Sequence, residues 1–463
     1  MIQDTICAIA TAQGGAIGSI RVSGPEAISI TGSIFKPAKA GKLLSEQKPY
    51  TLTFGRIYDG DEMIDEVLVS LFRAPHSYTG EDSTEITCHG STYILQQVMQ
   101  LLIKNGCRMA QPGEYTQRAF LNGKMDLSQA EAVADLIASS SAATHRLAMS
   151  QMRGGFSKEL TDLRNKLLNF TSMIELELDF SEEDVEFADR SELRRIAGNI
   201  DELLTRLCRS FSLGNVIKNG VPVAIVGNTN VGKSTLLNAL LREDRAIVSD
   251  IAGTTRDVIE DTINLNGITF RFIDTAGIRA TSDEVENIGI ERTFAKIGQA
   301  SVVLLLTDLN RGVESFEEYY HQVKSRLTSD AKLIIVLNKT DQVEDLLTPQ
   351  ETIRLFTSGE EIIPISARTG ANLDRLIQEL TRTVNLNTLN TSDVIVSNVR
   401  HYEALRNART AIERVNEGLE SGLSGEFISQ DIRECLHYLG EITGEITTDE
   451  VLGNIFKNFC IGK

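Results

Sequence analysis

Hydrophobic and polar positions divide the chain into stretches with different periodicities. Over the first 120 residues, short apolar runs broken by turn residues predict a mixed α/β domain. Strands are expected at 5–11, 18–22, 52–58, 66–72 and 83–88, and a helix is expected at 92–104. From 128 to about 217, apolar residues recur three and four positions apart, which is typical of long amphipathic helices. Strand and helix signals then alternate from 221 to about 386, and helical spacing returns at 402–419 and 428–443.

The two helical stretches flank the alternating α/β region. Neither stretch alone offers a large core, and a domain is inserted most easily where the ends of its host lie close together. We therefore expect an N-terminal α/β domain over 1–120, a discontinuous helical domain over 121–216 and 386–463, and an inserted α/β domain over 217–385. The length of 463 residues agrees with three domains, because single cores rarely grow beyond about 250–300 residues.

Composition and charge narrow the function classes. A hydrophobic fraction of 41% is ordinary for a globular protein, and a net charge of −18 excludes a non-specific nucleic-acid coat. The six scattered cysteines contain no C-x-x-C pair, which argues against a zinc knuckle or a disulfide framework and fits a reducing compartment. Because there is no basic signal segment and no apolar run of about 18 residues, we expect a soluble, cytoplasmic protein without membrane contact.

The clearest chemical signal is a phosphate-binding loop. A strand signal at 221–226 runs into Gly227-Asn-Thr-Asn-Val-Gly-Lys-Ser234, and a helical segment follows, so the order is strand, G-x-x-x-x-G-K-S, helix. Glycines let backbone N–H groups turn onto the β-phosphate, Lys233 spans the β- and γ-phosphates, and the Ser234 hydroxyl ligates Mg²⁺. A chance glycine-rich turn would lack the flanking strand and helix.

Further motifs of a guanine-nucleotide domain follow in order. They are Gly253-Thr-Thr-Arg-Asp257, Asp274-Thr-Ala-Gly277, Asn338-Lys-Thr-Asp341 and Ser366-Ala367. Thr255 can supply a second Mg²⁺ oxygen, Asp274 can hold that ion through water, and the Gly277 N–H can meet the γ-phosphate. The Asp341 carboxylate accepts hydrogen bonds from the N1–H and 2-amino groups of guanine, which adenine lacks, so the expected nucleotide is GTP. The inserted domain is therefore expected to be a Ras-like P-loop G domain.

The group that orients the attacking water is not evident from these motifs. Ile278 follows Gly277, where Ras-like proteins carry a glutamine, and isoleucine cannot orient water. Asp283, Glu284 and Glu286 lie a few residues further along the chain. On chemistry alone these acids compete for the role, and each can also be a solvated charge.

Over essentially its whole length, the chain resembles the tRNA-modification GTPase family MnmE, also called TrmE. The resemblance is carried by Gly14-Gly15, Arg21-Val-Ser-Gly24, Tyr78-Thr-Gly-Glu-Asp82, Arg118-Ala-Phe-Leu-Asn122, Lys124-Met-Asp-Leu127, the nucleotide motifs, Ser282-Asp-Glu-Val-Glu286 and Cys460-Ile-Gly-Lys463. It implies a dimerising, folate-binding N-terminal domain beside the discontinuous helical domain and the inserted G domain. The expected fold class is thus multidomain α/β plus all-α.

The resemblance also implies an activity. Members of the family work with an FAD-dependent partner, MnmG, and place an aminomethyl or carboxymethylaminomethyl group on carbon 5 of the wobble uridine of certain tRNAs. A tetrahydrofolate derivative resembling 5-formyltetrahydrofolate is the implied one-carbon source, and K⁺ stimulates the hydrolysis of GTP to GDP and phosphate. The implied assembly is a homodimer that forms a heterotetramer with MnmG and acts on tRNA.

Residue roles carry over by motif. The resemblance selects Glu286 as the water-positioning residue, with Lys233 as the other catalytic residue of hydrolysis, and it implies K⁺ ligands at Asn230, Ser249, Ile251 and Thr254. A monovalent cation there can stabilise charge on the transferring phosphoryl group as an arginine would. With Ser234 and Thr255 as the Mg²⁺ ligands, the expected GTP contacts are Gly227, Asn230, Val231, Gly232, Lys233, Ser234, Thr235, Ser249, Asp250, Ile251, Ala252, Gly253, Thr254, Thr255, Asp274, Thr275, Ala276, Gly277, Asn338, Lys339, Asp341, Ser366 and Ala367.

The folate contacts implied by the resemblance are Arg21, Glu85, Lys124 and Lys463. From the residues alone, each of them could equally be an ordinary surface charge. Cys460 is a catalytic candidate beside the folate, but an inert thiol is an equal alternative, because reactivity requires a lowered pKa. His89 has no companion ligands nearby in the sequence, so we expect it to be structural rather than metal-binding.

Two other function classes compete with this interpretation. A regulatory switch GTPase of ribosome assembly or signalling would join its G domain to an RNA-binding module, but the sequence contains no Lys/Arg-rich stripe or aromatic RNA platform. A structural scaffold with a vestigial G domain is disfavoured because the nucleotide motifs retain Lys233, Ser234, Thr255, Asp274 and Asp341.

Overall fold

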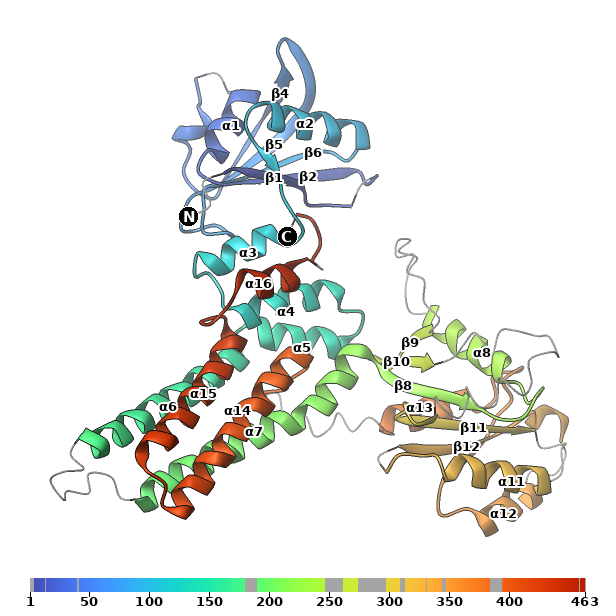
Figure 1. Ribbon diagram of the computed structural model, residues 1–463. Coiled ribbons are helices and arrows are strands. Elements are labelled where there is room, and N and C mark those ends of the chain that lie inside the picture. The colour runs from blue at the N-terminus through green and yellow to red at the C-terminus, as the bar shows by residue number, and fades with distance from the viewer. Residues whose placement is uncertain are drawn as a thin grey trace. The chain divides into compact units, whose positions relative to one another are not determined.

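The computed structural model describes residues 4–12, 14–39, 41–179, 190–245, 261–273, 297–308, 313–329, 331–343, 347–383, 394–457 and 459–462 (Figure 1). The chain divides into two compact units. Unit 1 comprises Met1–Ala138, Met149–Leu204 and Ala404–Lys463, and unit 2 comprises Ser139–Ala148 and Thr205–Glu403. The domain boundaries expected after residues 120, 216 and 385 stay predictions.

The N-terminal part of unit 1 is a seven-stranded sheet with two helices on one face (Figure 1). In spatial order, the strands are β3 (Phe35–Pro37), β4 (Thr51–Asp59), β5 (Glu62–Phe72), β6 (Ser83–His89), β2 (Ile17–Ser23), β1 (Ile6–Ile9) and β7 (Arg108–Met109). All neighbours are antiparallel except β1 and β7. Helices α1 (Ala27–Ile34) and α2 (Thr92–Lys104) share a core with the sheet. The five expected strands and the expected helix are confirmed.

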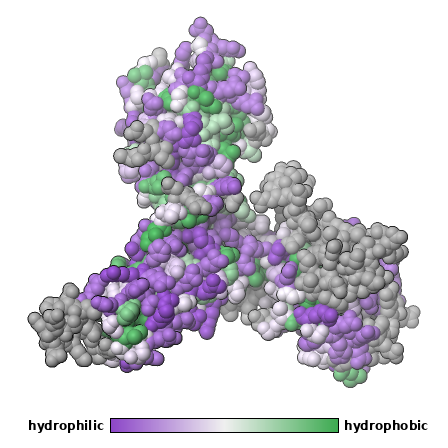
Figure 2. Space-filling view, viewed as in Figure 1, coloured by the Kyte–Doolittle hydropathy of each residue, from purple (hydrophilic) through white to green (hydrophobic). Residues whose placement is uncertain are grey.

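The opposite face of this sheet carries apolar side chains. The two-residue alternation along β4 and β5 buries Val67 and Val69 but leaves Leu52, Phe54 and Leu68 exposed. Phe54 lies directly opposite Leu68. On the face of the molecule seen in Figure 2, hydrophobic residues stand in small groups among hydrophilic ones.

The rest of unit 1 is helical and comes from both halves of the chain. Helices α4 (Leu127–Ala138), α6 (Gly155–Asp179) and α15 (Gly425–Thr443) pack together, and α3 (Glu114–Leu121) packs against α4 and α16 (Asp449–Phe456). The apolar stripe of α6 is buried as its spacing predicts: Leu160, Leu163, Leu167, Phe170 and Ile174.

Three further helices have residues in both units: α5 (Ala142–Met152), α7 (Arg190–Asn219) and α14 (Val399–Ser421). With them, the helical periodicity expected on both sides of the alternating region is confirmed. Among the described residues, none of the helices combines the length and the apolar character needed to span a bilayer.

Unit 2 is built on a six-stranded, mostly parallel sheet. In spatial order, the strands are β13 (Glu361–Pro364), β12 (Lys332–Asn338), β11 (Val302–Asp308), β8 (Val221–Val226), β10 (Ile268–Ile273) and β9 (Asp261–Leu265), and only β9 runs antiparallel to its neighbour. One face forms a core with α8 (Lys233–Arg245) and α13 (Leu373–Thr383), and the other with α11 (Val313–Lys324) and α12 (Leu347–Phe356). This is the doubly wound arrangement expected of a Ras-like domain, and its ligand edge is at the carboxyl ends of the strands.

Gly214 of α7 packs against the segment 394–398. A Cβ at residue 214 would lie 2.0 Å from the carbonyl oxygen of Val396, whose N–H donates to Ser210 Oγ at 3.0 Å. We expect Gly214→Ala to lower the free energy of unfolding by about 1–3 kcal/mol, because the backbone must move apart. Denaturant unfolding measures this change.

Gly198 supplies the control on the same helix, since a Cβ at this residue would have no other atom within 4 Å. We expect Gly198→Ala to be neutral or to stabilise by up to about 1 kcal/mol through helix propensity. Equal changes in the two variants would contradict the packing of 394–398 on α7.

Candidate functional site

The first candidate site surrounds the loop between β8 and α8. Gly227 and Gly232 have φ angles of 152° and 100°, which L side chains rarely adopt. A Cβ on Gly227 would lie 2.3 Å from the carbonyl oxygen of Leu306, and one on Gly232 would lie 2.3 Å from Asn338 Nδ2. Glycine is therefore required at both positions, and the loop presents bare backbone directly before the N-terminus of α8. This is the geometry of a phosphate cradle.

The Lys233 side chain folds back over this loop. Its Nζ donates to the carbonyl oxygens of Gly227 at 2.7 Å and Asn228 at 3.0 Å. Burial lowers the pKa of Lys233, because desolvation disfavours the ammonium ion. A bound phosphate would give this ammonium an anionic partner in place of carbonyl dipoles.

Asn338, at the end of β12, connects the cradle to the loop after β13. Its Nδ2 donates to the carbonyl oxygen of Val231 at 2.8 Å, and its Oδ1 accepts from the Ala367 N–H at 3.0 Å. Asn338 is 2% exposed and Ser366 is fully buried. The structure thus brings the phosphate loop together with Asn338 and Ser366-Ala367, which the sequence placed in one site.

Lys339 and Asp341 follow Asn338 in the expected base-recognition motif. Lys339 has a φ of 65°, and its Nζ donates to Asp308 Oδ2 at 2.6 Å. Asp341 accepts from the Ser366 hydroxyl at 2.7 Å and pairs with Arg368 at 3.0 Å. The Ser366 hydroxyl, followed by the smaller effects of Arg368 and Lys339, lowers the pKa of Asp341, so its carboxylate is an acceptor at neutral pH.

Several expected nucleotide-site residues lie outside the described residues. They are Ser249, Asp250, Ile251, Ala252, Gly253, Thr254, Thr255, Asp274, Thr275, Ala276, Gly277 and Glu286. Asn230, Val231, Ser234 and Thr235 are described and lie within the cradle or in the first turn of α8. Their expected contacts stay predictions.

A second candidate site is centred on Arg21 in unit 1. The Arg21 guanidinium donates to Glu85 Oε1 through Nε at 2.9 Å and lies 2.8 Å from it through Nη2. Arg21 Cζ lies 5.5 Å from the ring centre of Tyr78 and 5.6 Å from that of Tyr115. The guanidinium is therefore held between a carboxylate and two aromatic rings, an arrangement that fixes its orientation.

Residues 459–462, called the Cys460 segment, return to this site from the far end of the sequence. Arg21 Nη1 donates to the carbonyl oxygen of Gly462 at 3.3 Å, and the Gly113 N–H donates to that of Cys460 at 3.4 Å. The Cys460 side chain is exposed. Arg21, Glu85 and the Cys460 segment thus come together, while Lys463 lies outside the described residues.

Lys124 reaches the site only indirectly. Its Nζ donates to the carbonyl oxygen of Pro75 at 2.8 Å. Pro75 and Tyr78 belong to the same connection between β5 and β6, so Lys124 contacts the loop that supplies the Tyr78 ring. Its expected contact with a ligand stays a prediction.

No metal centre is found in the part of the chain that the structure describes: no three His, Cys, Asp or Glu side chains there could hold one ion. His89 Nδ1 lies 2.7 Å from Asp65 Oδ1, and the His89 N–H donates to Asp65 Oδ2 at 2.8 Å. Asp65 thus satisfies the backbone N–H and one ring nitrogen of His89, and the structural role expected for His89 stays a prediction.

Sequence reasoning missed Asp308, Arg368 and Tyr115. Asp308 ends a strand next to β12, so its position at the carboxyl edge of a parallel sheet was a usable signal. Arg368 directly follows Ser366-Ala367 but has no motif of its own. Tyr115 reaches Arg21 from α3, and nothing in the local sequence indicates that contact; its hydroxyl donates to the Arg21 carbonyl oxygen at 2.7 Å.

Comparison with known proteins identifies relatives over the full length. A family model described as the MnmE helical domain matches residues 127–460, and one described as the GTP-binding protein TrmE N-terminus matches residues 5–124. Proteins named tRNA modification GTPase MnmE from Bacteroides thetaiotaomicron and Bacteroides fragilis are 70% and 71% identical, each over 100% of both chains. A solved structure of an Aquifex aeolicus Era variant with GDP and AlF4⁻ is 31% identical over 41% of this chain and 66% of its own, with a TM-score of 0.29.

The base preference should follow the Asp341 carboxylate. Asp341→Asn replaces one acceptor oxygen with a donor, so we expect GTP affinity to fall while affinity for xanthosine triphosphate rises, because xanthine carries a carbonyl where guanine has its 2-amino group. Competition between the two nucleotides measures the change. Retention of the wild-type preference for GTP would remove Asp341 from base recognition.

Proposed function

The chain belongs to the tRNA modification GTPase family MnmE, and on that basis we propose that it couples GTP hydrolysis in unit 2 to modification of carbon 5 of the wobble uridine of tRNA. An FAD-dependent partner of the MnmG type takes part, and the group added is aminomethyl or carboxymethylaminomethyl. The contact between Arg21 and the Gly462 carbonyl supports the proposal that the one-carbon chemistry takes place in unit 1.

GTP occupies the bare-backbone cradle in this proposal. The loop N–H groups and Lys233 bind the phosphates, Asn338 holds the cradle to the base loop, and Asp341 binds guanine. Ser234 fits a magnesium ligand because it lies in the first turn of α8, directly after Lys233. Ser234 and Thr255 would hold the ion, which when bound neutralises charge on the phosphate oxygens.

Asn230 supports the proposed potassium site. It has a φ of 61° and is exposed within the loop that Gly227 and Gly232 shape, so its amide oxygen is available to a cation. Asn230, Ser249, Ile251 and Thr254 would hold K⁺, which when bound supplies the positive charge that an arginine supplies in other GTPases. Glu286 orients the attacking water.

The one-carbon unit comes from a derivative like 5-formyltetrahydrofolate, held by Arg21, Glu85, Lys124 and Lys463. Arg21 is oriented by Glu85 and lies beside two aromatic rings, so the site offers both charge and a flat apolar surface to a folate. The exposed Cys460 thiol lies on the segment that Arg21 and Gly113 hold in place, where it can reach a bound ligand.

The proposed assembly is a homodimer that forms a heterotetramer with the flavin-dependent partner in the cytoplasm. Leu52, Phe54 and Leu68 are 60%, 48% and 36% exposed on neighbouring strands, which supports a second copy of the chain as the occupant of that sheet face. The six cysteines are all free thiols, as a reducing compartment requires.

A substitution at Glu286 should impair GTP hydrolysis without impairing GTP binding. A water-positioning group acts mainly in the transition state, so we expect Glu286→Ala to leave GTP affinity within a few-fold while lowering kcat by roughly 10²–10⁴. Asp283→Ala and Glu284→Ala are the matched controls. Normal turnover of Glu286→Ala, with loss in one of the controls, would move the role to that neighbour.

Loss of the C-terminal residues from Cys460 onward should abolish tRNA modification without affecting GTP hydrolysis. We expect deletion of Cys460–Lys463 to leave K⁺-stimulated GTP hydrolysis near the wild-type rate and to abolish formation of the modified uridine in a reaction with the flavin-dependent partner, because unit 2 contains the nucleotide motifs. Cys460→Ser keeps the shape of the segment and removes the thiol, and so separates chemistry from packing. Wild-type tRNA modification by the deletion variant would remove the segment from the folate site.

A further inference from the structure

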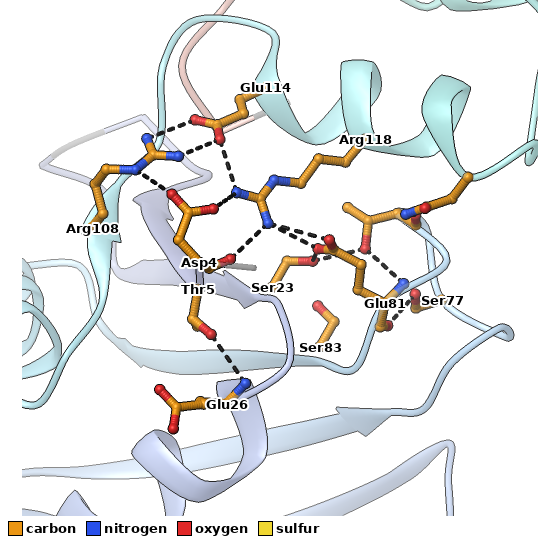
Figure 3. A network of polar contacts seen from close by, with 12 residues as sticks. Asp4, Thr5, Ser23, Glu26, Ser77, Glu81, Ser83, Arg108, Glu114 and Arg118 are labelled. Carbon is orange, nitrogen blue, oxygen red and sulfur yellow. Dashed lines mark hydrogen bonds and ion pairs between the residues drawn. The ribbon is translucent and has the colours of Figure 1, made fainter. Parts of the chain in front are cut away.

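Among the residues that the structure describes, Arg118 has the largest fully buried side chain, which is 1% exposed. It projects from α3 into a space between the start of β1 and the connection from β5 to β6 (Figure 3). A buried charge is stable only when it is paired and hydrogen-bonded. The partners of Arg118 therefore show what this charge holds in place.

Arg118 binds three carboxylates from three separate segments (Figure 3). Nη2 donates to Asp4 Oδ1 at 2.7 Å and to Glu114 Oε1 at 2.9 Å. Nη1 donates to the Asp4 carbonyl oxygen at 2.9 Å and lies 3.2 Å and 3.3 Å from the two Glu81 oxygens. A planar fork is needed to reach all three acids, and a lysine ammonium has no such geometry.

Arg108 is a second cation in this cluster of Arg118, Asp4, Glu81 and Glu114, and it pairs with Glu114 and Asp4. It binds Glu114 through Nη1 at 3.0 Å and Nη2 at 2.6 Å, and it donates to Asp4 Oδ2 at 2.7 Å. Burial raises the pKa of Glu114, but the hydrogen bonds from Arg108, the Gln111 N–H and Arg118 outweigh it and leave the pKa below its usual range. The hydrogen bonds of Arg108 go to Asp4, Glu114 and the Met109 carbonyl, so the link from the cluster to Glu81 is Arg118.

Glu81 makes several of the hydrogen bonds that hold the Tyr78 loop, defined as residues 73–82. Its Oε2 accepts from the Ser23 hydroxyl at 2.8 Å, its carbonyl oxygen accepts from the Ser77 hydroxyl at 2.5 Å, and its N–H donates to Thr79 Oγ1 at 3.3 Å. Ser77 and Thr79 flank Tyr78 on both sides. The position of Glu81 therefore sets where the Tyr78 ring lies.

The loop is also attached to α3 and the residues after it. The hydroxyls of Tyr78 and Thr116 lie 2.9 Å apart, and Asn122 Nδ2 donates to the Thr79 carbonyl oxygen at 2.8 Å. These contacts are between neutral groups, whereas Arg118 and Glu81 form a charged contact. Loss of the Arg118 charge would leave Asp4 and Glu114 with Arg108 and would leave Glu81 without its cationic partner, so Glu81 would turn outward to water.

We propose that Arg118 is a positioning residue that acts through Glu81 to fix the Tyr78 loop, so that the Tyr78 ring forms one wall of the folate site beside Arg21. The inference rests on the proposed folate site but goes beyond its ligand contacts. Arg118 does not touch the ligand. It sets the geometry of a side chain that does.

A fluorescent reporter tests the loop without any ligand. The chain contains no tryptophan, so Tyr78→Trp introduces a single indole at the site. Adding Arg118→Met to this variant should shift the emission to longer wavelength and increase quenching by acrylamide, because the loop turns outward. Arg108→Met is the matched control and should leave both signals unchanged. An unchanged signal in the Arg118 variant, or equal changes in both variants, would overturn the proposal.

Folate affinity tests the consequence for the site. Calorimetric titration of the full-length protein with 5-formyltetrahydrofolate should show a loss of at least about tenfold for Arg118→Met and for Glu81→Gln, and a change within about twofold for Arg108→Met. Arg118→Lys keeps the charge without the fork and should lose affinity as Arg118→Met does, which provides the test if Arg118→Met does not fold. Wild-type affinity in a folded Arg118→Lys variant would contradict the proposal.

A double-mutant cycle separates positioning from general stability. If Arg118 acts through the Tyr78 ring, Arg118→Lys should cost little further affinity once Tyr78→Ala has removed that ring. Additive losses would show that Arg118 acts elsewhere. If the wild-type protein does not bind 5-formyltetrahydrofolate while the tryptophan reporter still responds to Arg118, the folate part of the proposed function fails and the positioning of the loop stands.

Discussion

The hydrogen bond from Arg21 to the carbonyl of Gly462 joins the second strand of the chain to a segment more than 400 residues later. Gly462 has a φ of 93°, and a Cβ there would lie 2.7 Å from the carbonyl oxygen of Ile9, so the close approach depends on glycine. Since both ends of this span belong to unit 1, the chain must leave that unit and return to it. The segments of unit 2 accordingly lie between segments of unit 1 in the sequence.

Both candidate sites depend on glycines at positions where any side chain would clash with neighbouring atoms. In unit 2, glycines at residues 227 and 232 bring the backbone against Leu306 and Asn338, which gives the loop the shape of a phosphate cradle. In unit 1, Gly113 lies against Phe456 and Phe459, which brings the start of α3 to the Cys460 segment. Each site also depends on a held cation: the half-buried Lys233 is bound by two carbonyl oxygens of its own loop, and the buried Arg118 is bound by carboxylates from three segments.

Much of the fold was predictable because its signals are local. The short apolar runs of the N-terminal strands, the apolar stripe of α6 and the strand–glycine–helix order around Gly227 each lie within a short window of sequence. The nucleotide motifs also predicted that Asn338 and Ser366-Ala367 would meet the phosphate loop. Their convergence follows from the common carboxyl edge of parallel strands.

The contacts that sequence did not predict join residues far apart in the chain. Arg118 pairs with Asp4 and Glu81, and Lys339 pairs with Asp308, yet each of these residues alone is an ordinary charge. The family resemblance alone implied a place for Cys460 beside the folate. No periodicity predicts that the Gly462 carbonyl meets Arg21 or that the Cys460 carbonyl meets Gly113, because these residues are far apart in the sequence.

The central claim is that this GTPase acts in the modification of the tRNA wobble uridine. Mass spectrometry of nucleosides from the total tRNA of cells lacking the gene, with and without a plasmid copy of the wild-type chain, tests it most directly. We expect uridines with aminomethyl or carboxymethylaminomethyl groups at carbon 5 to disappear in the deletion strain and to return with the plasmid. Unchanged levels of these nucleosides in the deletion strain would contradict it.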